Sequence, residues 1–248
     1  MDIIIAYSSL FFASILSGLS VFLFNKNNQK ALKLITVFGG AFLFAVCFVD
    51  LIPAMFEVHN HNGCEHKHHS IIPIGAFILI GFLIQLLLEQ LSHGAEHGHI
   101  HYGEEKKSII SSIMLLIGVS IHAFLEGFPI VAQGTPNISM ITGIIIHNIP
   151  LSIVLVGAFL QSGLSKTKSI LLLAIFASMA IFGSLLNNNL DILHPYQNMI
   201  LGIVVGILLH VATTTLFDSE ESHKYNLTRF LIVILAFVIV ILLPAHTH

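Results

Sequence analysis

Residues 109–132 form the apolar stretch IISSIMLLIGVSIHAFLEGFPIVA, which contains one histidine and one glutamate. About 20 apolar residues suffice for a helix to cross the hydrocarbon layer of a membrane, so this stretch is expected to span one. Ionisable side chains at bilayer depth cost at least about 2.5–3.5 kcal/mol and usually have a function. His122 and Glu126 are four residues apart and therefore share one face of the expected helix. They can bind a single cation from the same side.

The composition of the whole chain is that of an integral membrane protein. Of 248 residues, 55% are hydrophobic and 9% are charged, and the mean hydropathy is +0.91. These values lie far outside the range of soluble domains. The first apolar stretch lacks a basic start, so we interpret it as a span and not as a secretory signal. The eight stretches expected to cross the bilayer are residues 3–24, 34–56, 71–91, 109–132, 139–161, 169–186, 198–217 and 227–244.

The placement of basic residues tests this count independently. Cytoplasmic loops of membrane proteins are enriched in lysine and arginine. Nine of the ten basic residues fall in or beside the first, third, fifth and seventh loops, and only Lys67 lies in an even-numbered loop. The sequence therefore predicts an all-α membrane protein with eight transmembrane helices and both termini outside the cytoplasm. The nine residues are Lys26, Lys30, Lys33, Lys106, Lys107, Lys166, Lys168, Lys224 and Arg229.

The fifth stretch carries the second part of a candidate metal centre. His147 and Asn148 lie near its middle, and the short connection at residues 133–138 makes the fourth and fifth stretches antiparallel neighbours. Two imidazoles and a carboxylate, completed by the Asn148 carbonyl oxygen or by water, suit a divalent ion such as Zn²⁺. Pro129 and Pro150 each remove a backbone hydrogen bond beside a candidate ligand, and membrane helices tolerate such breaks where polar groups satisfy the backbone.

Four further ionisable side chains lie in or near the spans. Asp50 is in the outer half of the second span, where a carboxylate attracts and accepts cations. Glu57, at the mouth of the same span, is more simply interpreted as a solvated acid. His210, in the middle of the seventh span, is open to three interpretations: a metal ligand, a proton carrier or a buried group that hydrogen-bonds between helices. Glu89, near the cytoplasmic end of the third span, is interpreted as structural, since its carboxylate can extend to the membrane surface or pair with Lys106 or Lys107.

We expect residues 1–248 to form one transmembrane transport domain with two histidine-rich loops. Residues 57–70 on the outer side and 92–108 on the cytoplasmic side together hold nine of the sixteen histidines. Short histidine-rich tracts bind transition metals through imidazole nitrogen, although a plain solvated loop is the alternative. The candidate accessory ligands in the cytoplasmic loop are His93, His97, His99 and His101.

Other features of the composition exclude some functions. Cys47 lies inside the second span and Cys64 in the second loop, so a disulfide between them is not expected. The net charge of −3 carries no signature of nucleic-acid binding. The remaining partners are therefore metal ions and the lipid bilayer.

A faint internal repeat links the second and seventh spans. Residues 40–45 read GAFLFA and residues 206–211 read GILLHV. The predicted topology runs these two segments in opposite directions, as in the inverted repeats of many secondary transporters.

The residues around the candidate ligands resemble the signatures of the ZIP (ZRT/IRT-like) family of divalent metal-ion transporters. The segment Ser120–Gly127 is similar to the family's histidine that is followed four residues later by glutamate and glycine. The segment His147–Pro150 resembles its second signature, and residues 39–53 resemble its second span. Eight spans, outward termini and a histidine-rich cytoplasmic loop also match, so the resemblance covers nearly the whole chain.

This resemblance implies that spans four and five, sandwiched between two inverted three-helix units, hold the metal. It also implies that ions move toward the cytoplasm by alternating access. Family members with a two-metal centre have a polar residue and an acid where this chain has Ala123 and Leu151. We therefore expect a mononuclear site, with Zn²⁺ or a similar divalent cation as the transported substrate and no organic cofactor. The ligands that the resemblance carries over are His122, Glu126, His147 and Asn148.

Two other functions remain open from the sequence. An intramembrane zinc-dependent hydrolase would hold the metal with the same histidines and use Glu126 as a base, but no His-Glu-x-x-His motif is present. A metal sensor would use the same ligands without moving an ion. The transporter is favoured, so the protein is not expected to be an enzyme. It is expected to be a multi-pass protein of the cell membrane, the bacterial inner membrane or its equivalent, and a homodimer is compatible with the sequence.

Overall fold

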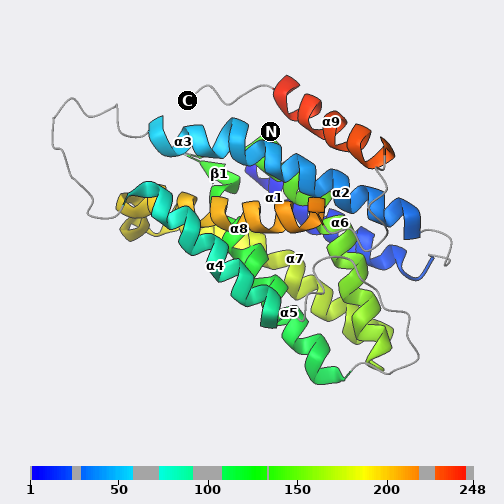
Figure 1. The fold of residues 1–248 in the computed structure, drawn as a ribbon. Helices are drawn as coiled ribbons and strands as arrows, with labels where there is room; N and C mark the ends of the chain where they lie inside the picture. Colours follow the sequence, from blue (N-terminus) through cyan, green and yellow to red (C-terminus); the bar gives the residue numbers. More distant parts are fainter. Residues whose placement is uncertain are drawn as a thin grey trace.

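The computed structural model describes residues 2–23, 29–57, 73–91, 108–132, 134–217 and 227–243. Almost all of these residues are helical, which confirms an all-α protein (Figure 1). The two histidine-rich loops, with His93, His97, His99, His101 and Cys64, lie outside the described residues. The metal-binding role expected of these histidines therefore stays a prediction.

The helices follow one another along the chain with one short hairpin between the fifth and the sixth. The hairpin strands are β1 (Val131–Ala132) and β2 (Thr135–Pro136). The α-helices are α1 (Ile3–Ser20), α2 (Gln29–Val46), α3 (Ile52–Glu57), α4 (Ile74–Leu91), α5 (Ile109–Glu126), α6 (Ile138–Gln161), α7 (Lys166–Asn189), α8 (Gln197–Phe217) and α9 (Leu227–Leu242). A π-helical turn, η2 (Cys47–Leu51), joins α2 to α3, and the 3₁₀ turns η4 (Phe128–Ile130) and η5 (Asp191–Tyr196) follow α5 and α7.

Each predicted span coincides with a helical segment. Six of these segments in the described part of the chain are long and apolar enough to cross a membrane, while Ile74–Gln90 and Leu227–Leu242 are shorter apolar helices. The second segment begins at Gln29, five residues before the predicted start, and α7 extends the predicted span by three residues at each end. Ser165 explains the earlier start of α7, because its hydroxyl caps the helix by accepting a hydrogen bond from the backbone N–H of Lys168.

Large apolar side chains cover the outside of the helices. Leu16, Leu79, Leu83, Leu171 and Leu242 are each at least 63% exposed. A soluble protein does not tolerate so many outward-facing leucines, but the hydrocarbon of a bilayer does. Together with the six long apolar helices, this surface identifies a multi-pass membrane protein.

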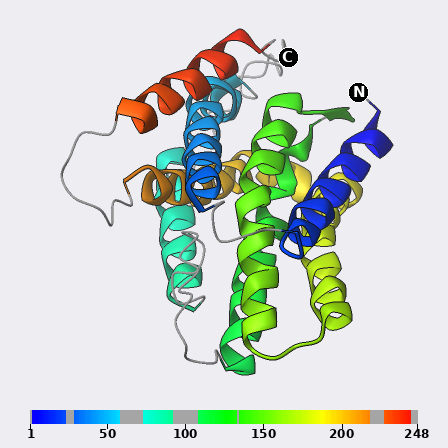
Figure 2. The same ribbon diagram turned by 90° about the vertical axis from the view of Figure 1, so that its right-hand side faces the viewer.

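The helices pack as two groups, which Figure 2 separates to the left and right. In the first group, α1 packs on α6 and α7, and α5 packs on α7. Its core contains Val119, Leu155, Phe159 and Leu173. In the second group, α8 packs on α4 and α2, and α9 packs on α2. Helix α2 also packs on α6 and thereby joins the two groups.

Helices α4 and α8 approach each other closely because glycine lies at their contact. A Cβ atom on Gly81 would lie 2.0 Å from the carbonyl oxygen of Ile203, and one on Gly206 would lie 2.0 Å from that of Ile78. Only glycine allows two helix backbones to touch in this way. This contact holds α4 against α8. Helix α4 carries the polar side chains Gln85 and Glu89, which are described below.

The two prolines have different effects on their helices. Helix α5 ends at Glu126, six residues before the predicted end of its span, because Pro129 cannot continue the helical hydrogen bonds. The chain then forms η4 and the hairpin, in which Gly134 has a φ of 80°, and returns as α6. Pro150 instead lies inside the continuous helix α6. This arrangement places the last turn of α5 beside the first half of α6.

Candidate metal centre

The last turn of α5 presents two ionisable groups to the protein interior. His122 and Glu126 lie on the same face of the helix, with His122 Nε2 3.1 Å from Glu126 Oε1. Both side chains are buried, at 1% and 0% exposure. A carboxylate this deeply buried requires a positive or hydrogen-bonding neighbour, since desolvation penalises its charge.

His147 of α6 completes a cluster with these two groups. It lies nine residues after the start of α6, while His122 lies nine residues before the start of β1, so the hairpin brings both to a similar depth. Their imidazole rings have centroids 5.8 Å apart at an angle of 69°. One ligand atom from each of His122, Glu126 and His147 lies within 4.8 Å of the others, and all three residues are buried.

The spacing and the chemistry of this cluster suit a divalent transition-metal ion. Nitrogen and oxygen ligands bind Zn²⁺ at about 2.0–2.2 Å, which places them about 3.3 Å apart around a tetrahedral ion. Side-chain adjustments of about 1 Å would bring the three atoms to that spacing. A fourth position stays available for Asn148, for water or for exchange.

Several buried oxygen atoms in the cluster, or close to it in sequence, have no hydrogen-bond donor among the described residues. Apart from the contact with His122, neither oxygen of Glu126 has a hydrogen-bond partner among the described residues. The same holds for Oδ1 of Asn148 and for Oγ of Ser152, which lie one turn apart on α6. Buried polar atoms are normally satisfied, so such a concentration of acceptors indicates a place for a cation or water. The donor set therefore fits a bound cation.

Asp50 lies away from this cluster, in the π-helical turn η2. Its Oδ2 accepts a hydrogen bond of 2.8 Å from Nδ2 of Asn137, and Asn137 Oδ1 caps α6 by accepting one of 2.8 Å from the N–H of Met140. Asn137 precedes His147 by ten residues, which is about 15 Å along a helix. Asp50 therefore lies at the N-terminal end of α6 and is not one of the three clustered side chains.

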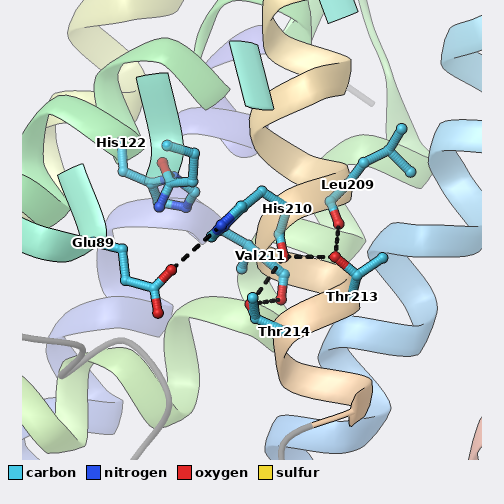
Figure 3. A network of polar contacts seen from close by, with 8 residues as sticks. Glu89, His122, Leu209, His210, Val211, Thr213 and Thr214 are labelled. Atoms are coloured by element: carbon cyan, nitrogen blue, oxygen red, sulfur yellow. Dashed lines mark hydrogen bonds and ion pairs between the residues drawn. The ribbon is translucent and has the colours of Figure 1, made fainter. Parts of the chain in front are cut away.

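His210 of α8 is not one of the three clustered ligands and faces Glu89 of α4, in the same close-up network as His122 (Figure 3). Its Nε2 is 3.4 Å from Glu89 Oε2 (Figure 3). Its ring packs against that of Phe82, with the two centroids 4.6 Å apart. His210 is buried, while Glu89 is 22% exposed. The lysines at residues 106–107, which the sequence suggested as partners of Glu89, lie outside the described residues.

Gln85 of α4 is a polar neighbour of the cluster that sequence reasoning missed. Its Oε1 lies 3.0 Å from Nδ1 of His122, and Gln85 is completely buried. One signal was available, because Gln85 is an amide in the middle of an otherwise apolar stretch. Asn137, the partner of Asp50, was missed as well, since helix caps are common and carry no functional signal alone.

These features together define a class of protein. Two imidazoles and a carboxylate, buried among membrane-spanning helices, suit the handling of transition-metal cations within the bilayer. The comparison with known families identifies the particular one: the chain belongs to the family of ZIP zinc transporters, whose model matches residues 3–108 and 92–244. This confirms the resemblance seen in the sequence. The family consists of metal-ion transporters and not of enzymes.

Individual relatives agree with this assignment. The chain is 26% identical over 245 residues to the zinc transporter ZIP9-B of Xenopus laevis, covering 81% of this chain and 80% of that protein. It is 25% identical over 192 residues to ZIP9 of Micropogonias undulatus, covering 62% and 61% of the two chains. It is 22% identical over 256 residues to ZIP1 of Takifugu rubripes, covering 86% and 85%. All three relatives are named zinc transporters.

Proposed function

We propose that this protein carries Zn²⁺, or a chemically similar divalent cation, across the cell membrane into the cytoplasm by alternating access. The observation that carries the proposal is the buried cluster of His122, Glu126 and His147 between α5 and α6. An ion that reaches this depth must exchange its water shell for protein ligands, and imidazole with carboxylate is a suitable replacement for Zn²⁺. The names of the relatives support zinc as the cargo.

Asn148 completes the proposed ligand set. Its buried Oδ1, adjacent in sequence to His147, has no hydrogen-bond partner among the described residues. The set then contains one carboxylate, and the positions where a second metal would need polar ligands hold Ala123 and Leu151. The site is therefore mononuclear. With a single carboxylate, one divalent ion leaves the centre with a net charge of about +1, which favours release of the ion.

The proposed topology has eight spans, with both termini outside the cytoplasm. Helices α1 and α7 run antiparallel: the Tyr7 hydroxyl lies 3.0 Å from that of Ser184 at one end, and the Lys166 ammonium lies 5.2 Å from the Phe22 ring at the other. The basic residues that begin α2, α7 and α9 in the described part of the chain belong to the predicted cytoplasmic side. Oriented this way, they satisfy the rule that cytoplasmic loops are basic.

The helix contacts support two inverted three-helix units around α5 and α6. An inverted two-fold operation would exchange α1 with α7, α2 with α8, α4 with α9 and α5 with α6. It would map the contact of α4 with α8 onto that of α9 with α2, and the contact of α1 with α6 onto that of α7 with α5. Both members of each pair are present.

The remaining polar groups mark a path on either side of the centre. Asp50 lies toward the outer end of α6, where its carboxylate attracts entering cations in exchange for its bond to Asn137. Glu89 and His210 lie toward the cytoplasmic ends of α4 and α8, and we assign His210 as a ligand on the exit side. The cytoplasmic loop histidines, His93, His97, His99 and His101, then receive the released ion.

The decisive experiment is uptake of radioactive Zn²⁺ into proteoliposomes that contain the purified protein. Saturable uptake by the wild type, lost in His122→Ala and in Glu126→Ala, would support transport through the proposed centre. Asp191→Ala is the matched control, because Asp191 is an exposed acid outside the cluster and its loss should leave uptake unchanged. Zinc binding without uptake would instead indicate a sensor, and uptake unaffected by both substitutions would place the path elsewhere. Sorting vesicles by protein orientation then tests the direction.

A further inference from the structure

The transported ion requires a particular arrangement of the His122 ring, and a side chain outside the ligand set controls it. We propose that Gln85 of α4 is a positioning residue that holds His122 with its hydrogen on Nδ1 and with Nε2 directed at the ion. This inference deepens the proposed function and rests on it.

The His122 ring is held between two oxygen atoms. On one side Nδ1 lies 3.0 Å from Oε1 of Gln85, and on the other Nε2 lies 3.1 Å from Oε1 of Glu126. All three residues are at most 1% exposed. Water therefore does not compete for the ring, and the protein alone decides its orientation.

The chemistry of the neutral imidazole makes the Gln85 contact directional. A neutral ring has one N–H and one lone pair, and only the lone pair binds a metal ion. With the amide oxygen of Gln85 as acceptor, the hydrogen resides on Nδ1 and the lone pair of Nε2 faces Glu126 and the ion. The reversed amide would donate to Nδ1, place the hydrogen on Nε2 and block binding. Metal-bound histidines commonly use an outer partner in this way.

The hydrogen bond crosses the boundary between the two helix groups. Gln85 belongs to α4 in the second group, whereas His122 belongs to α5 in the first. The contact of Gly81 and Gly206 with the facing backbones fixes α4 on α8, so Gln85 projects from a firmly held helix. Any rearrangement of α5 against α4 during transport would break this bond and release the His122 ring. The bond therefore favours ion binding in the arrangement seen here.

A merely structural role for Gln85 makes a different prediction. A buried amide that only satisfies packing would affect folding stability when replaced, but it would leave the affinity of folded protein for metal unchanged. A positioning role depends on an acceptor atom at this place. Gln85→Glu keeps that acceptor, while Gln85→Leu has a similar size and lacks it.

The test measures binding of Zn²⁺ to purified protein in detergent by titration calorimetry. Gln85→Leu should weaken binding by about 10–100-fold, the range for loss of an outer partner of a metal-bound histidine. Gln85→Glu should bind at least as tightly as the wild type. Gln90→Leu is the matched control, since Gln90 is an exposed amide on the same helix, and its affinity should be unchanged. Gln85→Met replaces Gln85→Leu if the leucine variant does not fold.

Absorption of bound Co²⁺ gives a second readout that reports on the ligand field. The Co²⁺ spectrum of Gln85→Leu should differ from those of the wild type and Gln85→Glu. Equal affinity and spectra for wild type and Gln85→Leu, with binding lost in His122→Ala, would overturn this inference and leave the proposed centre intact. Equally weak binding by the leucine and glutamate variants would also overturn it. Wild-type binding by His122→Ala would overturn the proposed centre itself.

Discussion

The described part of the protein contains two imidazole–glutamate pairs that differ in their surroundings. His122 lies 3.1 Å from Glu126, and His210 lies 3.4 Å from Glu89, so the two pairs have similar geometry. The first is joined by His147 from another helix and by acceptors that lack donors among the described residues, and its carboxylate is fully buried. The second has a phenylalanine against its ring and a partly exposed carboxylate. Convergence of several helices, and not the pair itself, distinguishes a binding centre.

One face of helix α4 contacts the histidines of both pairs. Gln85 and Glu89 are four residues apart, and each contacts one of the two histidines. The contact of Gln85 reaches the centre, whereas that of Glu89 reaches the C-terminal half of α8. The comparison therefore contrasts the proposed binding centre with the proposed exit-side ligand, and four predictions test it.

The largest difference should come from neutralising each glutamate. Glu126→Gln removes the only carboxylate of the centre, so Zn²⁺ affinity should fall by more than about 100-fold, beyond the 10–100-fold typical of an outer partner. Glu89→Gln is the matched variant and should change the affinity much less, because Glu89 is not one of the three clustered ligands. Zn²⁺ titration of both proteins in detergent measures the effect. Similar losses in the two variants would remove the distinction between the pairs.

A second large effect should follow from separating α4 from α8. Gly81→Ala places a methyl group against the backbone of Ile203, and such overpacking costs about 1–3 kcal/mol of stability. The free energy of unfolding in detergent, obtained from denaturant titration, measures this cost. Gly75→Ala on the same helix is the control, because no atom lies within 4 Å of the added group. Equal stability of the two variants would mean that the close contact does not hold α4 in place.

A smaller effect is expected from Asn148, the oxygen proposed to complete the centre. Asn148→Ala should weaken Zn²⁺ binding by about tenfold, since a neutral oxygen contributes less than a charged ligand. Ser152→Ala, one turn further along α6 and also a buried acceptor, should leave the affinity nearly unchanged. Competition with a metal-binding dye gives both constants. The reverse order of the two variants would move the fourth ligand to Ser152.

The smallest change in affinity should come from His210. His210→Ala should alter Zn²⁺ binding at the centre less than the other substitutions, because His210 is not one of the three clustered ligands. The maximal rate of uptake should nevertheless fall, since the proposed exit-side ligand is lost. Parallel measurements of binding and vesicle uptake separate the two quantities. A large loss of binding would show that His210 belongs to the centre after all.

The helical segments, the family and part of the candidate metal centre could be predicted from local sequence. The apolar stretches predicted the helical segments because a membrane-spanning helix needs a fixed length of apolar residues, and periodic spacing placed His122 and Glu126 on one face. The signature segments predicted the family, which the family match confirms. The end of α5 at Glu126 was missed by six residues, since hydropathy continues through Pro129 while the helix does not.

The sequence by itself determined the membrane class, the family and the identity of the polar residues inside the spans. Only the tertiary structure decided their partners: Gln85 for His122, Asn137 for Asp50 and Glu89 for His210. The first two pairs are 37 and 87 residues apart in the chain. Hydropathy and helical periodicity describe one helix at a time, whereas these contacts depend on which faces the helices turn toward one another. Close packing through small residues such as Gly81 and Gly206 sets those faces.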